Sequence, residues 1–437
     1  VNFQELKKFL SFSIIKNIFG GTFSTILLEM KPHESIIKLV CISGFLDLFG
    51  VAMVYPQLVH RAKELGASPR NIGLFGSIYG TLQFFSSPVM GQISDHLGRR
   101  NVLIVALLGT SLSYFLLGTV GSILFLSLAR IPSGIFKFSS AMNKAFLVDI
   151  NPPESRAGVL GKFNAASSIG FVIGPTIAGW MMQTSGGFQL VAYISGTIFI
   201  INALFNHFVV SKYLDTLIDV QQNNQRDNDK KPISLFAAFN VFRDAQNVPW
   251  HAVWEPFLNR FLMSFSLIIY RANFTSILAF KFGTDTLMNG YIQSFNGATS
   301  MATGWMLGII SNFFPSNTLM HNTFSIILVI SLFILSVTPS LYIYVLCIIP
   351  LCVSSSVLRV TNGTAIANRA GEEARGLVMG LADTLTALAR AFGPAIAGFA
   401  LEVSYEAPGL CAATFALIGT LIGLYAKSEA TRMLHVE

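Results

Sequence analysis

The segment PPESRAGVLGKFNAASSIGFVIGPTIAGW, residues 152–180, returns in altered form as GEEARGLVMGLADTLTALARAFGPAIAGF at residues 371–399. Each copy opens near a Glu-x-Arg triplet and continues as a mainly apolar run. The Gly-Pro pair at 174–175 aligns with the pair at 393–394. A repeat this long, placed half a chain apart, indicates that the two halves of the protein share one architecture.

The apolar run of each copy belongs to a series that extends along the whole chain. The 437 residues are 52% hydrophobic and only 12% charged, whereas soluble proteins carry roughly a quarter charged residues. Runs of about 20 apolar residues can cross ~30 Å of hydrocarbon as helices, because a backbone in lipid must satisfy its polar groups internally. The sequence therefore predicts an all-α, polytopic membrane protein with twelve transmembrane helices in two pseudo-symmetric six-helix bundles. The expected spans are 38–58, 72–93, 101–119, 122–146, 160–182, 188–210, 252–280, 287–310, 319–338, 341–365, 376–401 and 408–427.

A polar segment rich in Asn, Gln, Asp and Lys, residues 211–240, separates six spans from six. The predicted organisation is a cytoplasmic N-terminal tail (1–37), a first bundle (38–210), a cytoplasmic linker (211–250), a second bundle (251–427) and a cytoplasmic tail (428–437). Residues 9–28 are also apolar, but Lys16 interrupts them. We expect a tail or surface helix there, with a thirteenth span as the alternative.

The distribution of Lys and Arg predicts the orientation. With the N-terminus in the cytoplasm, eleven of these residues lie in inner loops and four in outer loops. Cytoplasmic loops carry the excess, so both termini are expected inside. The net charge of +7 therefore reflects the excess of Lys and Arg in the cytoplasmic loops and does not indicate nucleic-acid binding. The four cysteines fall in spans, which argues against a disulfide framework.

The loop GQISDHLGRR, residues 91–100, joins the second and third spans. Gly91 would let helices approach closely, and Gly98 would permit a tight turn. Arg99 and Arg100 would hold the loop on the cytoplasmic side. Asp95 could pair with Arg99 or lie at the positive N-terminus of a neighbouring helix, and a simple topology anchor is the alternative. A weaker copy, GIISNFFPSN at 308–317, lacks the acid and both arginines.

Four segments carry a family resemblance. The loop 91–100, the fourth-span segment LARIPSG (128–134) and the first-span segment FLDLFGVAMVYP (45–56) resemble the major facilitator superfamily, in the drug:proton antiporter branch that includes tetracycline exporters. In the fourth span Arg130 and Gly134 match, but Ser133 replaces the usual Gln. The fifth span resembles the antiporter signature, with Ala178 in place of one glycine, at Gly161, Gly170, Gly174, Pro175 and Gly179.

The resemblance implies an alternating-access fold. It also implies that Asp95 contacts the eleventh span and latches the outward-facing state. The fifth span would be tightly packed and bent, which would limit leakage, although ordinary packing explains the same glycines and proline. Gly76-x3-Gly80 in the second span is interpreted as a packing motif.

Asp47 lies near the middle of the first span among apolar neighbours. An ionised carboxylate there is costly unless it is paired or faces water. We predict that Asp47, together with Arg130, couples transport to protons; a structural ion pair with a base is the alternative.

Arg130, Lys137 and Lys144 are spaced by seven residues in the fourth span. In a continuous helix this spacing places all three on one face. Lys144 could instead reach the cytoplasmic surface or pair with Asp149. Arg271 and Arg390 add positive charge in the seventh and eleventh spans. The predicted substrate cavity therefore consists of Arg130, Lys137, Lys144, Arg271 and Arg390.

This excess of bases over acids predicts an anionic or zwitterionic solute, because Arg is a forked donor to carboxylate, sulfate or phosphate. The resemblance by itself points to cationic or amphiphilic compounds. The predicted function is secondary active transport of a small organic solute by alternating access, as proton-coupled antiport, with uniport as a competing mode. The rival is a membrane receptor or scaffold that retains the fold.

The sequence offers no Ser/His/Asp arrangement, metal-spaced His/Cys cluster or phosphate-cradling motif. We therefore expect no enzyme activity, no cofactor and no metal. The expected partners are the lipid bilayer, the solute and protons, without nucleic acid, and the protein is expected to be a monomer.

Overall fold

The computed structural model describes residues 32–210 and 250–434, and within them the chain is helical without strands. The predicted helix at 9–28 and almost all of the predicted linker lie outside the described residues. The first half contains α2 (Pro32–Glu64), α3 (Pro69–Leu97), α4 (Arg99–Gly118), α5 (Ile123–Phe136), α6 (Ser139–Asp149), α7 (Pro153–Met181) and α8 (Gly187–Phe205), which runs into the short π-helix η1 (Asn206–Val210). The second half contains α11 (Trp250–Ala272), α12 (Phe274–Phe282), α13 (Thr286–Asn312), α14 (Asn317–Val337), α15 (Leu341–Arg369), α16 (Gly371–Val403) and α17 (Ala407–Leu434).

Two of the expected spans are broken. α5 and α6 together occupy the fourth expected span, and α11 and α12, bent by 48°, occupy the seventh. With each broken pair taken as one span, the described elements match the twelve expected spans in order. Seven described helices are long and apolar enough to cross a membrane, and the bent pair would be an eighth. α3, α7 and α13 fall short of that test, and each of them packs against the opposite half.

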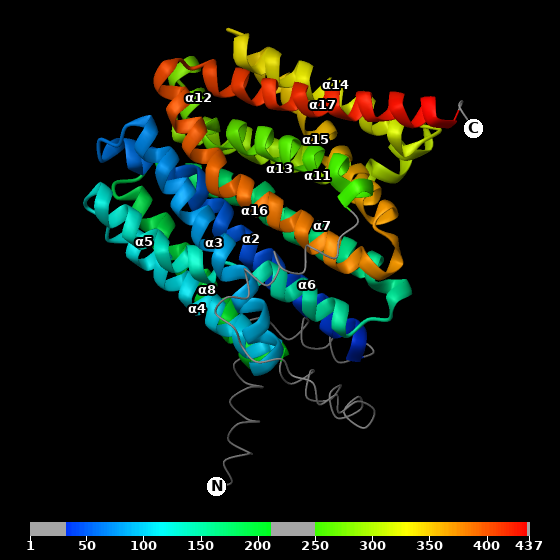
Figure 1. Cartoon of the computed structure of the whole chain (residues 1–437). Helices are drawn as coiled ribbons and strands as arrows, with labels where there is room; N and C mark the ends of the chain where they lie inside the picture. Colours follow the sequence, from blue (N-terminus) through cyan, green and yellow to red (C-terminus); the bar gives the residue numbers. More distant parts are fainter. Residues whose placement is uncertain (1–31, 211–249, 435–437) are drawn as a thin grey trace.

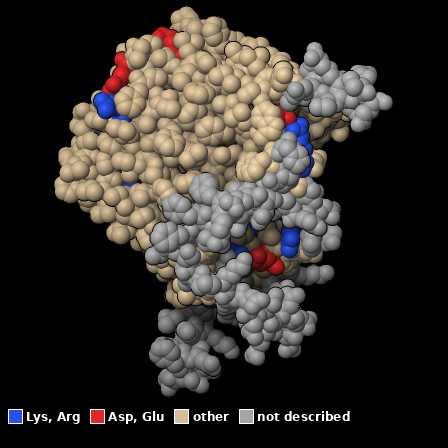
Figure 2. Space-filling view, in the orientation of Figure 1, with Lys and Arg blue, Asp and Glu red and all other residues tan. Residues whose placement is uncertain are grey.

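Each half has its own hydrophobic core. Figure 1 shows the first-half helices, blue to green, gathered on one side and the second-half helices, green to red, on the other. The first core includes Leu107 and Phe199, and the second includes Leu328 and Tyr344, all completely buried. Figure 2 shows a broad surface almost free of charged side chains, as expected for helices that face lipid.

The two most extensive contacts between the halves are α3 against α16 and α7 against α13, and α2 also touches α12 and α13. In the first contact, a Cβ built on Gly73 would lie 2.3 Å from the Pro394 carbonyl oxygen, and one on Gly80 would lie 2.1 Å from the Arg390 carbonyl oxygen. Proline has no N–H, so Pro394 cannot donate to the carbonyl of Arg390, four residues earlier. Only a glycine lets the neighbouring backbone come this close to that freed carbonyl.

The second contact repeats this arrangement. A Cβ built on Gly290 would lie 2.5 Å from the Pro175 carbonyl oxygen, and one on Gly297 would lie 2.9 Å from the Phe171 carbonyl oxygen. Pro175 is the counterpart of Pro394 in the sequence repeat, and Phe171 is again the residue four positions earlier. The repeat therefore extends to how each half binds the other.

The same four helices separate at their other ends. Gly91 of α3, Gly161 of α7, Gly304 of α13 and Gly380 of α16 each have open space where a Cβ would lie. These glycines are on the side where α3 turns into α4 and where residues 210 and 250 lie, which we call the linker end. The structure is thus closed at the opposite end, the closed end, and open at the linker end.

Gly98 is the whole connection between α3 and α4 and has a positive φ of 86°. A residue with a Cβ is strained in this region, so the predicted tight turn is present.

Candidate functional site

The break in the fourth span lies at Lys137 and Phe138, because α5 ends at Phe136 and α6 begins at Ser139. Side chains of α3 satisfy backbone carbonyls near the break. Gln83 Nε2 donates to the Lys137 carbonyl oxygen at 2.9 Å, and Ser86 Oγ donates to the Gly134 carbonyl oxygen at 3.2 Å. A non-helical turn at membrane depth is tolerated where protein covers it in this way.

This break corrects the prediction of a single basic face. Arg130 lies in α5, Lys137 at the break and Lys144 in α6, so the three side chains are not carried by one continuous helix. The spacing of seven residues fits a continuous helix, but the chain departs from helical geometry at the residue that carries the middle charge.

Lys137 forms an ion pair with Asp47 of α2. The Lys137 ammonium donates to Asp47 Oδ1, and Ser139 Oγ donates to the same oxygen at 2.6 Å. The Asp47 side chain is completely buried, while the Lys137 side chain is 11% exposed and its Nζ lies 4.9 Å from the centroid of the Phe199 ring. Asp47 Oδ2 has no hydrogen-bond partner among the described residues. The ion pair that was the alternative explanation for Asp47 is thus present, and its base is Lys137 rather than Arg130.

Arg130 is 8% exposed, and its guanidinium carbon lies 4.4 Å from the centroid of the Tyr79 ring. This is a cation–π contact, which satisfies no hydrogen bond. The Arg130 Nε is buried and has no partner among the described residues. A buried guanidinium with an unused donor is well suited to a bound acceptor.

Arg271 of α11 is half-buried and Arg390 of α16 is exposed, and each shares a tyrosine with Arg130 as an electrostatic neighbour. Tyr55 of α2 interacts electrostatically with Arg130 and Arg271, and Tyr79 of α3 with Arg130 and Arg390. None of the ion pairs formed within the described residues includes any of the three arginines. We call Arg130, Arg271 and Arg390 the central arginine group, since it joins both halves of the protein.

Lys144 lies closer to the linker end than this group. It is half-buried and interacts electrostatically with Asp383 and Arg359 of the second half. Asp383 in turn accepts a hydrogen bond from Arg260 Nη2 at 2.7 Å. Arg260 was not among the residues predicted from the sequence, although a base inside the seventh expected span was the available signal.

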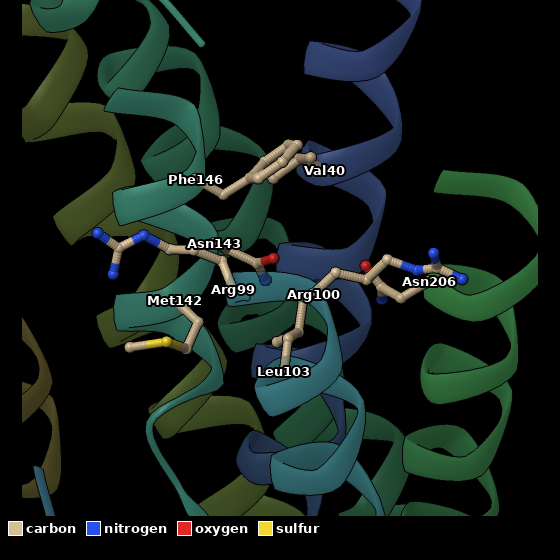
Figure 3. A pocket seen from close by; sticks show the side chains of 8 residues that line it. All are labelled: Val40, Arg99, Arg100, Leu103, Met142, Asn143, Phe146 and Asn206. Atoms are coloured by element: carbon tan, nitrogen blue, oxygen red, sulfur yellow. The ribbon is translucent and has the colours of Figure 1, made fainter. Parts of the chain in front are cut away.

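The two arginines of the loop 91–100 hold the first half together at the linker end. Arg99 Nε donates to Asp149 Oδ2 at 2.7 Å, and Arg100 Nη2 donates to the His207 carbonyl oxygen at 2.9 Å. Asp149 is therefore the partner of Arg99 and forms no ion pair with Lys144 among the described contacts. Figure 3 shows both arginines beside a small pocket, whose other lining residues are Val40, Leu103, Met142, Asn143, Phe146 and Asn206. The side chain of Asp95 lies outside the described residues, so its contact with α16 stays a prediction.

Most of the fifth-span motif packs closely. A Cβ built on Gly170 would lie 2.6 Å from the Phe49 backbone nitrogen, one on Gly174 3.0 Å from the Ala52 Cβ, and one on Gly179 3.1 Å from the Leu287 Cα. Gly161 faces open space instead. The packing explanation of the motif therefore describes its closed-end part, and the role in limiting leakage stays a prediction.

Comparison with known proteins agrees with this arrangement. The family model described as Major Facilitator Superfamily matches residues 40–394. Multidrug resistance protein 2 of Bacillus subtilis (strain 168) is 24% identical over 412 residues, covering 93% of this chain and 99% of that protein. Tetracycline resistance protein, class E, of Escherichia coli is 32% identical over 168 residues, which cover 37% of this chain and 42% of that protein.

Solved structures share the fold. The human organic anion transporter MFSD10 (TETRAN) has a TM-score of 0.61 at 20% identity, covering 90% of this chain and 100% of that chain. A bacterial homologue of the human lysosomal transporter Spinster, in an inward-facing and occupied conformation, has a TM-score of 0.68 at 13% identity, covering 91% of this chain and 98% of that chain. The chain belongs to the major facilitator superfamily, and it is a multi-pass membrane transporter.

Proposed function

We propose that the protein carries an organic anion across the membrane by alternating access, with proton linkage through Asp47. The observation that supports this most is the central arginine group. Arg130 lies over the Tyr79 ring, Arg271 and Arg390 of the other half interact electrostatically with Tyr55 and Tyr79, and none of the three has an acidic partner among the described residues.

The acids near the cavity are already engaged. Asp47 is paired with Lys137, and Asp383 with Arg260. Cations left together in a low dielectric repel one another and any cationic solute. A carboxylate, sulfonate or phosphate placed among them would relieve this repulsion and accept forked hydrogen bonds.

The tyrosines add an aromatic component to the site. Tyr55 is 42% exposed, and Tyr79 already stacks against the Arg130 guanidinium. Aromatic rings of this kind favour a solute with a flat apolar body next to its charge. The name of the structural neighbour MFSD10, an organic anion transporter, fits the same substrate class.

The orientation follows from the excess of Lys and Arg in the predicted inner loops. We place the linker end and both termini in the cytoplasm, so that the described conformation is open inward and closed outward. The protein would work as a monomer, because each six-helix half supplies part of one site.

Transport of benzenesulfonate, an aromatic anion that stays ionised at all working pH values, tests this proposal. Purified protein in liposomes should take it up, and Arg130→Gln or Arg271→Gln should lower the initial rate by about tenfold or more, since each removes a charged donor. Arg369→Gln is the matched control, because Arg369 is 46% exposed and pairs with Glu255 at the linker end.

Transport of organic cations without benzenesulfonate transport would contradict the anion assignment. Binding without transport of either class would favour the receptor or scaffold. Equal loss of rate in the Arg369→Gln control would show that the arginine substitutions act through folding.

A further inference from the structure

Asp47, the proposed proton site, interacts electrostatically with the same tyrosines as the proposed anion site. Tyr79 interacts with Asp47, Arg130 and Arg390 together, and the Arg130 guanidinium lies directly over its ring. Tyr114 of α4 likewise interacts with both Arg130 and Asp47. Lys137 follows Arg130 by seven residues at the end of α5, a rise of about 10 Å. An anion held by Arg130 is therefore close enough to the Lys137–Asp47 pair for the two negative charges to affect one another.

Lys137 is the base that pairs with Asp47 among the described residues. The described titratable groups from α3 and α4 that face the carboxylate are Tyr79 and Tyr114. α6 contributes the hydroxyl of Ser139. Among the described contacts, the side chains that α7 and α8 place beside residues 43–50 of α2 are uncharged and include Phe163, Ser167, Phe199 and Asn202. Lys162 of α7 interacts electrostatically with Cys41, six residues before Asp47.

From this arrangement we infer that the bound anion and a proton on Asp47 stabilise each other, so that the two cross the membrane in the same direction. The inference rests on the proposed function and adds the sign of its coupling. A negative solute beside Asp47 disfavours the ionised carboxylate and so favours its protonated form. Linkage is reciprocal, so protonation of Asp47 must tighten anion binding by the same factor.

Two details of the ion pair suit this role. Asp47 Oδ1 is occupied by Lys137 and Ser139, whereas Oδ2 has no partner in the described part of the chain and can take the proton. When Asp47 is neutral, the Lys137 ammonium loses its counter-ion and adds a fourth positive charge to the site. The anion then replaces the carboxylate as the counter-ion of Lys137.

Whether the proton and the solute cross in the same or in opposite directions depends on the charge of the solute. A cation would compete with the proton for Asp47, which gives exchange, the antiport that the family resemblance implies. An anion cooperates with the proton, which gives cotransport. The predicted anion and the predicted antiport therefore cannot both hold if Asp47 carries the proton.

Isothermal titration of the purified protein with benzenesulfonate tests the inference. Titrations in two buffers with different ionisation heats give the number of protons exchanged per anion bound. We expect net proton uptake of up to one proton, and affinity that tightens by up to about tenfold for each unit fall in pH.

Asp47→Asn should abolish both the proton uptake and the pH dependence while benzenesulfonate still binds. Glu255→Gln, which removes another acid paired with a base, should retain both. Should Asp47→Asn fail to fold, the sign of proton exchange in the unmodified protein decides the question alone.

Proton release, or no proton exchange, on binding would overturn the inference and leave the proposed anion site intact. Proton uptake that persists in Asp47→Asn would also overturn it. Absence of any benzenesulfonate binding would instead refute the proposed function, and the inference with it.

Discussion

The contact of α3 with α16 and the contact of α7 with α13 share a backbone plan but differ in their side chains. In each contact, two glycines seven residues apart on one helix lie against two carbonyl oxygens of the opposite helix. One carbonyl belongs to a proline, and the other belongs to the residue four positions before that proline. The carbonyl that rests on Gly80 belongs to Arg390, a member of the central arginine group. The carbonyl that rests on Gly297 belongs to Phe171.

The α7–α13 contact is neutral throughout its described part. Thr176 Oγ1 bonds to Ser294 Oγ at 2.8 Å, and Trp180 Nε1 donates to the Tyr291 hydroxyl at 2.9 Å. The groove beside them is lined by Val172, Ile173, Thr176, Ile177, Ser294, Phe295 and Ala298. The shared backbone plan is thus the part that joins the halves, and the unshared charge is the part that we propose binds the solute.

Of the substitutions in these two contacts, Gly80→Val should have the largest effect on the ratio of closed to open molecules. Its Cβ would lie 2.1 Å from a backbone oxygen that cannot move independently, so α3 and α16 must separate. Overpacking of this kind costs about 1–3 kcal/mol, which would shift the ratio of closed to open molecules at the closed end by about 5- to 150-fold. Distances between spin labels at Glu64 and Glu402, both exposed near the closed end, would report it.

Gly91→Val is the control for this substitution, because the same helix has open space at that glycine. An unchanged label distance in Gly80→Val, or an equal change in Gly91→Val, would contradict the close-contact explanation.

Gly297→Val should have a smaller effect of the same kind. The corresponding distance to the Phe171 carbonyl oxygen is 2.9 Å, so a shift of a few tenths of an ångström relieves most of the clash. We also expect benzenesulfonate affinity to be unchanged here and weakened in Gly80→Val, because only α16 carries a member of the central arginine group. Titration of both variants with benzenesulfonate measures the two affinities. A larger loss of affinity in Gly297→Val than in Gly80→Val would contradict the proposed difference between the two contacts.

Thr176→Val should have the smallest effect. It removes one hydrogen bond, worth about 1 kcal/mol, from the neutral contact and leaves the backbone packing intact. Thermal unfolding of the purified protein measures this loss. Thr299→Val, whose hydroxyl bonds only to the Phe295 carbonyl of its own helix at 2.9 Å, should be near neutral. If Thr176→Val and Thr299→Val destabilise the protein equally, the hydrogen bond between the halves contributes no more than a bond within one helix.

The repeat at 152–180 and 371–399 predicted the shared architecture correctly, because Pro175 and Pro394 occupy equivalent places in the structure. Only some of the glycines that pack against these two proline segments were recognised from the sequence. Gly76-x3-Gly80 was interpreted as packing, and it does pack, since a Cβ on Gly76 would lie 2.7 Å from the Pro394 Cβ. The seven-residue spacing shared by 73 and 80 and by 290 and 297 was the signal that would have identified both contacts.

The sequence pattern singled out both Asp47 and Lys137 but did not identify them as partners. A buried Asp47 required a base, and several were available at similar depth. The choice of Lys137 depends on a helix break, and that break depends on Gln83 and Ser86 of another helix. Periodicity describes one helix at a time, so it could not reveal a turn that a neighbouring helix stabilises.

Counterflow in liposomes loaded with the matching unlabelled solute separates an anion carrier from a cation carrier, because it detects exchange without an imposed pH or voltage gradient. Labelled benzenesulfonate and labelled tetraethylammonium would be added to separate samples of the same preparation. The account predicts transient accumulation of benzenesulfonate, its loss in Arg130→Gln, and no accumulation of tetraethylammonium. Accumulation of tetraethylammonium alone would contradict it.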